Sequence, residues 1–248
     1  ERLIYAMKRF ILPAILLFPF MLLAFWVYHG TSIRQDMAKD SADASIAARL
    51  QEYGPSSRAR LRPFFDAAQV SYPPARVVLL GLKQEKLLEI YVTGTNQNLR
   101  FLCSYPILAA SGSAGPKLRE GDQQVPEGIY PVESLNPNSK FHLALRVGYP
   151  NQFDRDQARL DGRDNLGGDI MIHGGAASVG CLAMGDPAAE DLFVLAADAG
   201  IENVTVIISP VDFRKVGEVS SPGKPLPAWT GSLYQTLISK LHELPLKN

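Results

Sequence analysis

The sequence predicts a mainly β, α+β domain with peripheral helices, preceded by one N-terminal transmembrane helix. Two observations carry this prediction. An uncharged apolar run covers residues 10–28, and short apolar runs bounded by Gly, Pro, Asn and Asp recur from residue 75 to residue 208. The 248 residues suffice for one sizeable domain with appendages. The formal net charge is zero, which argues against a nucleic-acid-binding protein.

The apolar run over residues 10–28 has the length of a membrane span. As a helix it would measure about 28 Å, close to the roughly 30 Å hydrocarbon core of a bilayer. Three basic residues precede it, whereas basic and acidic residues balance after it. The positive-inside rule therefore places the N-terminus in the cytoplasm and the remainder outside. A cleaved signal peptide is the alternative, which the bulky residues 25–28 disfavour.

The remaining chain divides into three segments. Residues 31–55 are polar and Ala-rich and are predicted to form a linker or loose helix after the cytoplasmic tip and anchor of residues 1–30. Residues 56–210 form the main domain. Residues 211–248 form a C-terminal extension, whose amphipathic stripe over 233–244 predicts a helix. We favour packing of this helix on the domain over a role as a partner or membrane helix.

The main domain opens with a helix and continues with strands. Ser56 and Ser57 are candidate N-caps for a helix with Leu61, Phe64, Phe65 and Ala68 on one face. Apolar runs predict strands over 77–80, 87–92, 99–103, 169–172 and 204–208, with a turn at 96–98. A further helix is predicted over 187–199, ended by Gly200.

The stretch from Ile170 to Met184 carries the candidate chemistry. An apolar strand ends in His173, a loop of small residues follows, and the loop ends in Gly180 and Cys181. A thiol is mostly protonated at neutral pH, so a nucleophilic Cys needs a base within hydrogen-bond reach. The spacing fits His173 as base, and the backbone N–H groups of Gly180 and Cys181 as oxyanion donors. The alternative is a buried structural Cys beside a packed His.

Metal and disulfide chemistry have little support in the sequence. The two cysteines and four histidines show no metal-ligand spacing, so no structural metal is expected. Cys103 falls on a predicted strand and is expected in the core. A Cys103–Cys181 disulfide is conceivable in an oxidising compartment, and it would block the proposed nucleophile.

Several motifs resemble those of one enzyme family. The pattern Ile172-His173-Gly174 with Ser178-x-Gly180-Cys181 resembles the active site of YkuD-type L,D-transpeptidases. Residues 115–130, which end in Val-Pro-Glu-Gly-Ile-Tyr, resemble an upstream family segment, and residues 141–143 and 148–151 also match. The resemblance covers roughly residues 56–208. It is strongest for the branch of YafK-like proteins, which share the Gly-Pro-Lys-x-x-Glu-Gly-Asp run found at 115–122.

The resemblance implies an extracytoplasmic catalytic domain over 56–210 that acts on peptidoglycan without a cofactor. Family members attack the meso-diaminopimelate carbonyl of a stem peptide with the Cys, form a thioester, and pass the acyl group to an amine. The implied partners are peptidoglycan stem peptides and, through the anchor, the inner membrane, with the catalytic domain in the periplasm. No nucleic-acid partner is expected.

Two positions depart from the usual transpeptidase pattern. Val179 stands where most members carry a His, and Ala183 stands where most carry an Arg. The YafK-like branch commonly has the Ala, and it includes a member that hydrolyses the bond between peptidoglycan and an outer-membrane lipoprotein. The sequence therefore supports acylation of Cys181 more firmly than transfer over hydrolysis. A catalytically inactive peptidoglycan-binding module is the alternative from another class.

Further candidates for substrate binding are weaker. Ser178 is expected to support the loop or the thiolate, and His142 to line the cleft, with simple packing as the alternative for His142. Lys117 and Arg119 are candidates for binding substrate carboxylates, with a solvated turn as the alternative. Asp122 is expected to cap the turn at Gly121.

Overall fold

The structure, a computed structural model, describes residues 45–94, 98–217, 219 and 225–246. The described strands form a nine-stranded mixed sheet with the order β3-β2-β1-β9-β5-β6-β7-β8-β4. In chain order, the elements after a helix over residues 45–68 are β1 Arg76–Leu82, β2 Leu87–Thr93, β3 Leu99–Pro106, β4 Ala109–Ala110, β5 Gly128–Ser139, β6 His142–Val147, α2 Gln152–Leu160, β7 Met171–His173, β8 Leu182–Ala183, α3 Asp186–Ala199, the 3-10 turn η1 Ile201–Asn203, β9 Val204–Ser209 and α4 Thr230–His242.

The centre of the sheet is buried on both faces, which explains its unbroken apolar runs. β1 pairs with β2 antiparallel and with β9 parallel. Val78, Leu80 and Leu82 of β1 join a core cluster with Leu233, Leu237 and Leu241 of α4. The alternate residues of β1 are equally buried and point to the opposite face. There α3 packs against β1 and β6.

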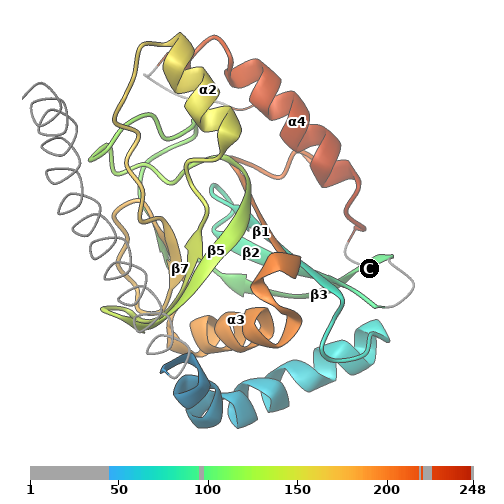
Figure 1. Cartoon of the computed structure of the whole chain (residues 1–248). Coiled ribbons are helices and arrows are strands. Elements are labelled where there is room, and N and C mark those ends of the chain that lie inside the picture. Colours follow the sequence, from blue (N-terminus) through green and yellow to red (C-terminus); the bar gives the residue numbers. More distant parts are fainter. Residues whose placement is uncertain (1–44, 95–97, 218, 220–224, 247–248) are drawn as a thin grey trace, which may run out of the picture. The chain divides into compact units, whose positions relative to one another are not determined.

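The helices lie in two pairs, one on each face of the sheet (Figure 1). The helix over 45–68 runs beside α3, and ion pairs join them: Arg58 to Asp198 at 2.7 Å, and Arg60 to Glu190 and Asp191 at 2.8 Å each. On the other face α2 lies beside α4, where Phe153 meets Trp229 edge-on. The predicted packing of the C-terminal helix on the domain is therefore confirmed.

The predicted strands and the helix before Gly200 are confirmed, with bounds shifted by a few residues. The predicted start of the first helix, at Ser56 and Ser57, is wrong. Residues 45–55 are already helical, and the Ser56 hydroxyl donates to the Tyr53 carbonyl within the helix instead of capping it. Leu61 and Phe65 are buried as expected, whereas Phe64 is exposed. β5, β6 and α2 were not predicted at all.

The predicted membrane run lies outside the described residues, as do residues 31–44 of the linker and residues 96–97 of the turn. Within the described part of the chain, no helix has the length and apolar character needed to cross a bilayer.

A buried ion pair fastens the long segment between β4 and β5 to the core. The Lys83 ammonium donates to Glu127 Oε1 at 2.8 Å and to the carbonyls of Gly115 and Val125. The Tyr234 hydroxyl of α4 donates to Glu127 Oε2 at 2.9 Å. Glu127 is 1% exposed, so its charge depends on these donors.

Replacing Glu127 with Gln is expected to lower the free energy of unfolding by about 3 kcal/mol, because the Lys83 ammonium loses its buried counter-charge. Urea unfolding of purified protein measures the change. Asp66→Asn is the matched control, since the exposed Asp66 carboxylate pairs with Arg62 at 3.9 Å and the loss of this pair should cost under about 0.5 kcal/mol. Equal losses for both variants would contradict the assigned role of Glu127.

Candidate active site

The pairing of β7 with β8 brings His173 and Cys181 to the same face of the sheet. The two strands are parallel, with Ile172 opposite Leu182 and His173 opposite Ala183. Ile172 and Leu182 are fully buried and point into the core. Side chains alternate along a strand, so His173 and the residue just before Leu182, Cys181, point to the other face. The loop over residues 174–181 thus joins two parallel strands, and the alternation predicts that the thiol and the imidazole share one face.

His173 is held as a neutral base. Its Nδ1 lies 2.6 Å from the Gly174 carbonyl oxygen, and because a carbonyl only accepts, Nδ1 carries the proton. Nε2 is therefore the basic nitrogen. His173 is only 3% exposed, and this burial lowers its pKa from the ordinary value of 6.5. At neutral pH the imidazole is uncharged and able to accept a proton.

Cys181 is held as a neutral thiol. Its Sγ accepts the Met171 N–H at 3.4 Å and lies 3.7 Å from the Asp169 carbonyl oxygen, to which it donates. Burial raises the pKa of Cys181 above its ordinary value of 9.0. The hydrogen bond from the Met171 N–H lowers this pKa, the negative charge of Asp169 raises it, and the positive charge of Lys117 lowers it, each by less than burial raises it. The resting pair is consequently thiol and imidazole, and the proton must move during the reaction.

The glycines after His173 permit a close approach of three segments. A Cβ on Gly174 would lie 2.5 Å from Asp186 Oδ1, 2.8 Å from the Phe141 carbonyl oxygen and 2.9 Å from His142 Cβ. Gly175 has a φ of +67°, and its N–H donates to Asp186 Oδ1 at 2.8 Å. Asp186, the first residue of α3, thereby fixes the loop that begins at His173.

Two hydroxyls order the loop before Cys181. Ser178 Oγ donates to the Cys181 carbonyl at 2.6 Å and accepts the N–H groups of Cys181 and Ser111, each at 3.2 Å. Ser111 Oγ accepts the Gly180 N–H at 2.5 Å. The supporting role predicted for Ser178 fits these bonds. The N–H groups expected to bind an oxyanion are occupied by hydroxyls here, so that role stays a prediction and requires these hydroxyls to yield.

The other predicted binding residues are partly committed elsewhere. The Lys117 ammonium is buried and donates to Asp122 Oδ1 at 2.6 Å and to the Arg119 carbonyl. Asp122 also accepts the N–H groups of three nearby residues, which confirms that it caps this turn. Arg119 is exposed. His142 Nε2 lies 3.1 Å from Glu190 Oε1. A role for these residues in binding substrate stays a prediction.

The two positions that depart from the usual pattern differ in exposure. Val179 is 74% exposed, whereas Ala183 is fully buried between His173 on β7 and Ala109 on β4. Arg146 of β6 pairs with Asp169 at 2.5 Å and with Glu133 at 2.9 Å.

Cys103 is a free, buried thiol on β3, as predicted for a core residue. Cys181 is also free. β3 and β8 lie near opposite ends of the strand order. Among the described residues, no three His, Cys, Asp or Glu side chains gather as metal ligands.

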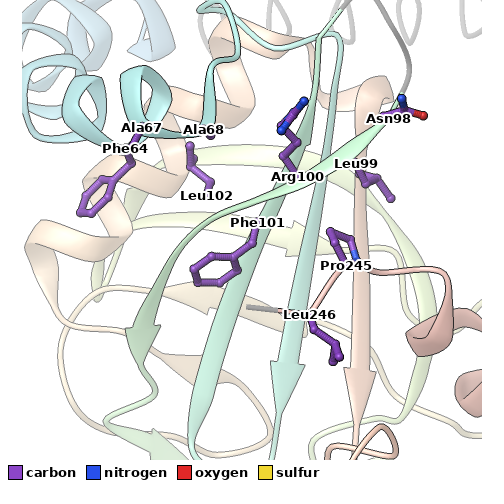
Figure 2. A pocket seen from close by; sticks show the side chains of 10 residues that line it. All are labelled: Phe64, Ala67, Ala68, Asn98, Leu99, Arg100, Phe101, Leu102, Pro245 and Leu246. Carbon is purple, nitrogen blue, oxygen red and sulfur yellow. The ribbon is translucent and has the colours of Figure 1, made fainter. Parts of the chain in front are cut away.

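A pocket away from the candidate site lies along β3, where the start of β3, the end of the first helix and the C-terminal residues meet (Figure 2). None of its lining residues belongs to the predicted site. They are Phe64, Ala67, Ala68, Asn98, Leu99, Arg100, Phe101, Leu102, Pro245 and Leu246.

Ser111 was missed from the sequence because it lies 69 residues before Gly180 and belongs to no recognisable nucleophile pattern. Phe141 was noted only as part of a matching segment. Only the fold brings either residue to the site.

The site so assembled defines a cysteine–histidine protein in which a β-sheet presents both groups. Residues 75–208 match the model of the YkuD L,D-transpeptidase catalytic domain. The chain belongs to this family. It is 36% identical over 133 residues to the Escherichia coli K12 protein named "Putative L,D-transpeptidase YafK", covering 52% of this chain and 51% of the relative. The chain thus spans about half the length of that relative and of its counterpart in E. coli O157:H7.

Solved structures show more distant likenesses. The helical cell shape determining protein Pgp2 of Campylobacter jejuni is 23% identical, with a TM-score of 0.45 over 55% of this chain and 48% of that chain. The L,D-transpeptidase 1 of Mycobacterium tuberculosis is 15% identical, with a TM-score of 0.31 over 54% and 62% of the respective chains. Family membership rests on the domain match and not on these likenesses.

The pH dependence of thiol alkylation tests the neutral resting pair. Because burial raises the pKa of Cys181, the thiolate forms only as pH rises past the ordinary value of 9.0. The rate of iodoacetamide alkylation at Cys181, followed by peptide mass spectrometry, should climb steadily through that pH. A rate that is already half-maximal below about pH 7 would reveal a thiolate–imidazolium pair instead. Cys103, whose pKa burial raises to about 12, should stay unmodified in the folded protein.

Proposed function

We propose that the protein is a peptidoglycan-modifying cysteine acyl-transfer enzyme. It forms a thioester with a stem-peptide diaminopimelate carbonyl and passes the acyl group to an amine. The observation that supports this proposal is the parallel pairing of β7, which ends in His173, with β8, which directly follows Cys181. The bond between His173 Nδ1 and the Gly174 carbonyl leaves Nε2 as the basic nitrogen. Family membership supplies the substrate class.

The first half-reaction moves one proton and exchanges one bond. Cys181 Sγ attacks the carbonyl carbon while His173 Nε2 takes the thiol proton. The C–N bond then breaks, the departing amine receives the proton from Nε2, and the acyl group stays on sulfur as a thioester. His173 returns to its neutral form. Burial raises the pKa of the Cys181 thiol. The thiolate of a thiol with a higher pKa is the stronger nucleophile, so Cys181 becomes strongly nucleophilic once its proton has moved to His173.

The second half-reaction decides the product. An acceptor amine or a water attacks the thioester carbonyl, gives its proton to Nε2, and releases the thiol of Cys181. Transfer to an amine gives a new peptide bond, and attack by water gives hydrolysis. The buried Ala183 favours hydrolysis as a second candidate, because no cation at this position can hold an acceptor carboxylate. Its substrate would be a lipoprotein joined to peptidoglycan.

We also propose that the catalytic domain lies in the periplasm, attached to the inner membrane. The apolar run over residues 10–28 and the basic residues before it support this placement. An exported domain would meet its peptidoglycan substrate directly. No cofactor takes part in the proposed chemistry.

Incubation with muropeptides that carry a meso-diaminopimelate tetrapeptide tests the acyl-enzyme. Peptide mass spectrometry should find the stem-peptide acyl group on Cys181 in the parent protein. Cys181→Ala should abolish the adduct because the nucleophile is lost, whereas Cys103→Ala, the matched control, should retain it. Full turnover by Cys181→Ala would overturn the proposal, and peptidoglycan binding without an adduct would establish the inactive binding module instead.

The same reaction in ¹⁸O-labelled water, with an amine acceptor present, separates transfer from hydrolysis. Transfer predicts an acceptor-linked product without label. Hydrolysis predicts one ¹⁸O atom in the released carboxylate. The ratio of the two products gives the partition of the thioester.

A further inference from the structure

The outer face of the catalytic imidazole is covered by an aromatic ring. The rings of Phe141 and His173 are stacked, with centroids 4.7 Å apart and an interplanar angle of 26°. Phe141 is 46% exposed, whereas His173 is 3% exposed. An exposed aromatic side chain that covers a buried base gives up its own burial to do so, which points to a role at the site.

The backbone delivers Phe141 to this position. It lies between β5 and β6, at the tip of their hairpin, where the Phe141 N–H donates to Ser139 Oγ at 3.1 Å. The Phe141 carbonyl oxygen would be 2.8 Å from a Cβ on Gly174. Gly174 therefore lets the tip approach the loop that carries His173, and any larger residue would push the tip away.

The helix over residues 45–68 holds the hairpin tip from outside. Arg49 Nε donates to the Pro137 carbonyl at 3.1 Å, and its Nη2 donates to Asn138 Oδ1 at 3.4 Å. The ring of Tyr53 packs edge-on against His142, 4.9 Å between centroids. His142 in turn contacts Glu190 of α3. Glu190 also pairs with Arg60, which belongs to the helix over residues 45–68. These contacts anchor the residues on both sides of Phe141.

We propose, building on the proposed function, that Phe141 is a positioning residue that fixes the ring plane of His173, and that the helix over 45–68 keeps Phe141 in place. One hydrogen bond from Nδ1 to the Gly174 carbonyl does not by itself stop the imidazole from rotating about its Cβ–Cγ bond. A ring stacked on its face removes that freedom. Nδ1 then stays bonded to the Gly174 carbonyl, and Nε2 stays the basic nitrogen.

Two substitutions at Phe141 test the stacked ring. Phe141→Ala removes the ring, so the imidazole can rotate away from the Gly174 carbonyl and then exchange tautomers. Phe141→Tyr keeps a planar ring and should keep the imidazole in place. Phe64→Ala is the matched control, since Phe64 is 40% exposed, lies on the same helix as Arg49, and lines the pocket along β3. Arg49→Ala tests the support of the tip, with Arg62→Ala as its control, because the Arg62 side chain is exposed and pairs with Asp66 at 3.9 Å, away from the tip.

Imidazole ¹⁵N chemical shifts of His173 at about pH 7.5, where the ring is neutral, report which nitrogen carries the proton. The parent protein, Phe141→Tyr, Phe64→Ala and Arg62→Ala should show the Nδ1–H form. Phe141→Ala should show a mixture of both forms. The rate of acyl-enzyme formation should fall about tenfold in Phe141→Ala and about threefold in Arg49→Ala, and recover in Phe141→Tyr.

An unchanged tautomer and an unchanged rate in Phe141→Ala would overturn the inference. Failure of Phe141→Tyr to restore both would do the same, because stacking would then not be the cause. The tautomer measurement uses no substrate. If the parent protein forms no acyl-enzyme, the proposed function fails, while the ¹⁵N shifts still decide whether Phe141 positions His173.

Discussion

The parallel pairing of β7 with β8 is the interaction on which the site depends. Its register places His173 opposite Ala183 and Ile172 opposite Leu182. A slip of one residue would turn the thiol or the imidazole toward the core, because side chains alternate between the faces of a strand. The buried pair Ile172 and Leu182 resists such a slip, since it would bring apolar side chains into water. The core of the sheet thereby sets the geometry of the chemistry.

The surrounding contacts keep this short pairing in place. Each of the two strands has only two or three residues, so they need support from other segments. Ser111 and Ser178 tie the loop to the segment after β4, and Asp186 ties it to α3. The segment after β4 is in turn fastened to the core by the Lys83–Glu127 pair and by Tyr234 of α4. Residues remote from Cys181 thus contribute to its position.

The sequence predicted the central strands because strands buried on both faces are continuous apolar runs. β5 escaped prediction since Pro131 and Pro137 interrupt it, and because it pairs first with β9 and then with β6 across two register shifts. The capping box of α2, Asn151 with Asp154, was present but not used. His173 and Cys181 could be proposed from the sequence because both lie in one contiguous segment. Ser111 and Phe141 reach the site only through the sheet.

The central claim is that His173 takes the proton of a neutral Cys181 thiol as the thioester forms. The most direct measurement is the rate of acylation of Cys181 by a tetrapeptide muropeptide in the parent protein and in His173→Ala, across pH. In His173→Ala the acylation rate at neutral pH should fall about a hundredfold or more, because no base takes the thiol proton. The rate should recover in part as pH rises past the raised pKa of Cys181, where hydroxide supplies the thiolate. Equal rates at neutral pH in the parent protein and in His173→Ala would contradict a role for His173 as the base.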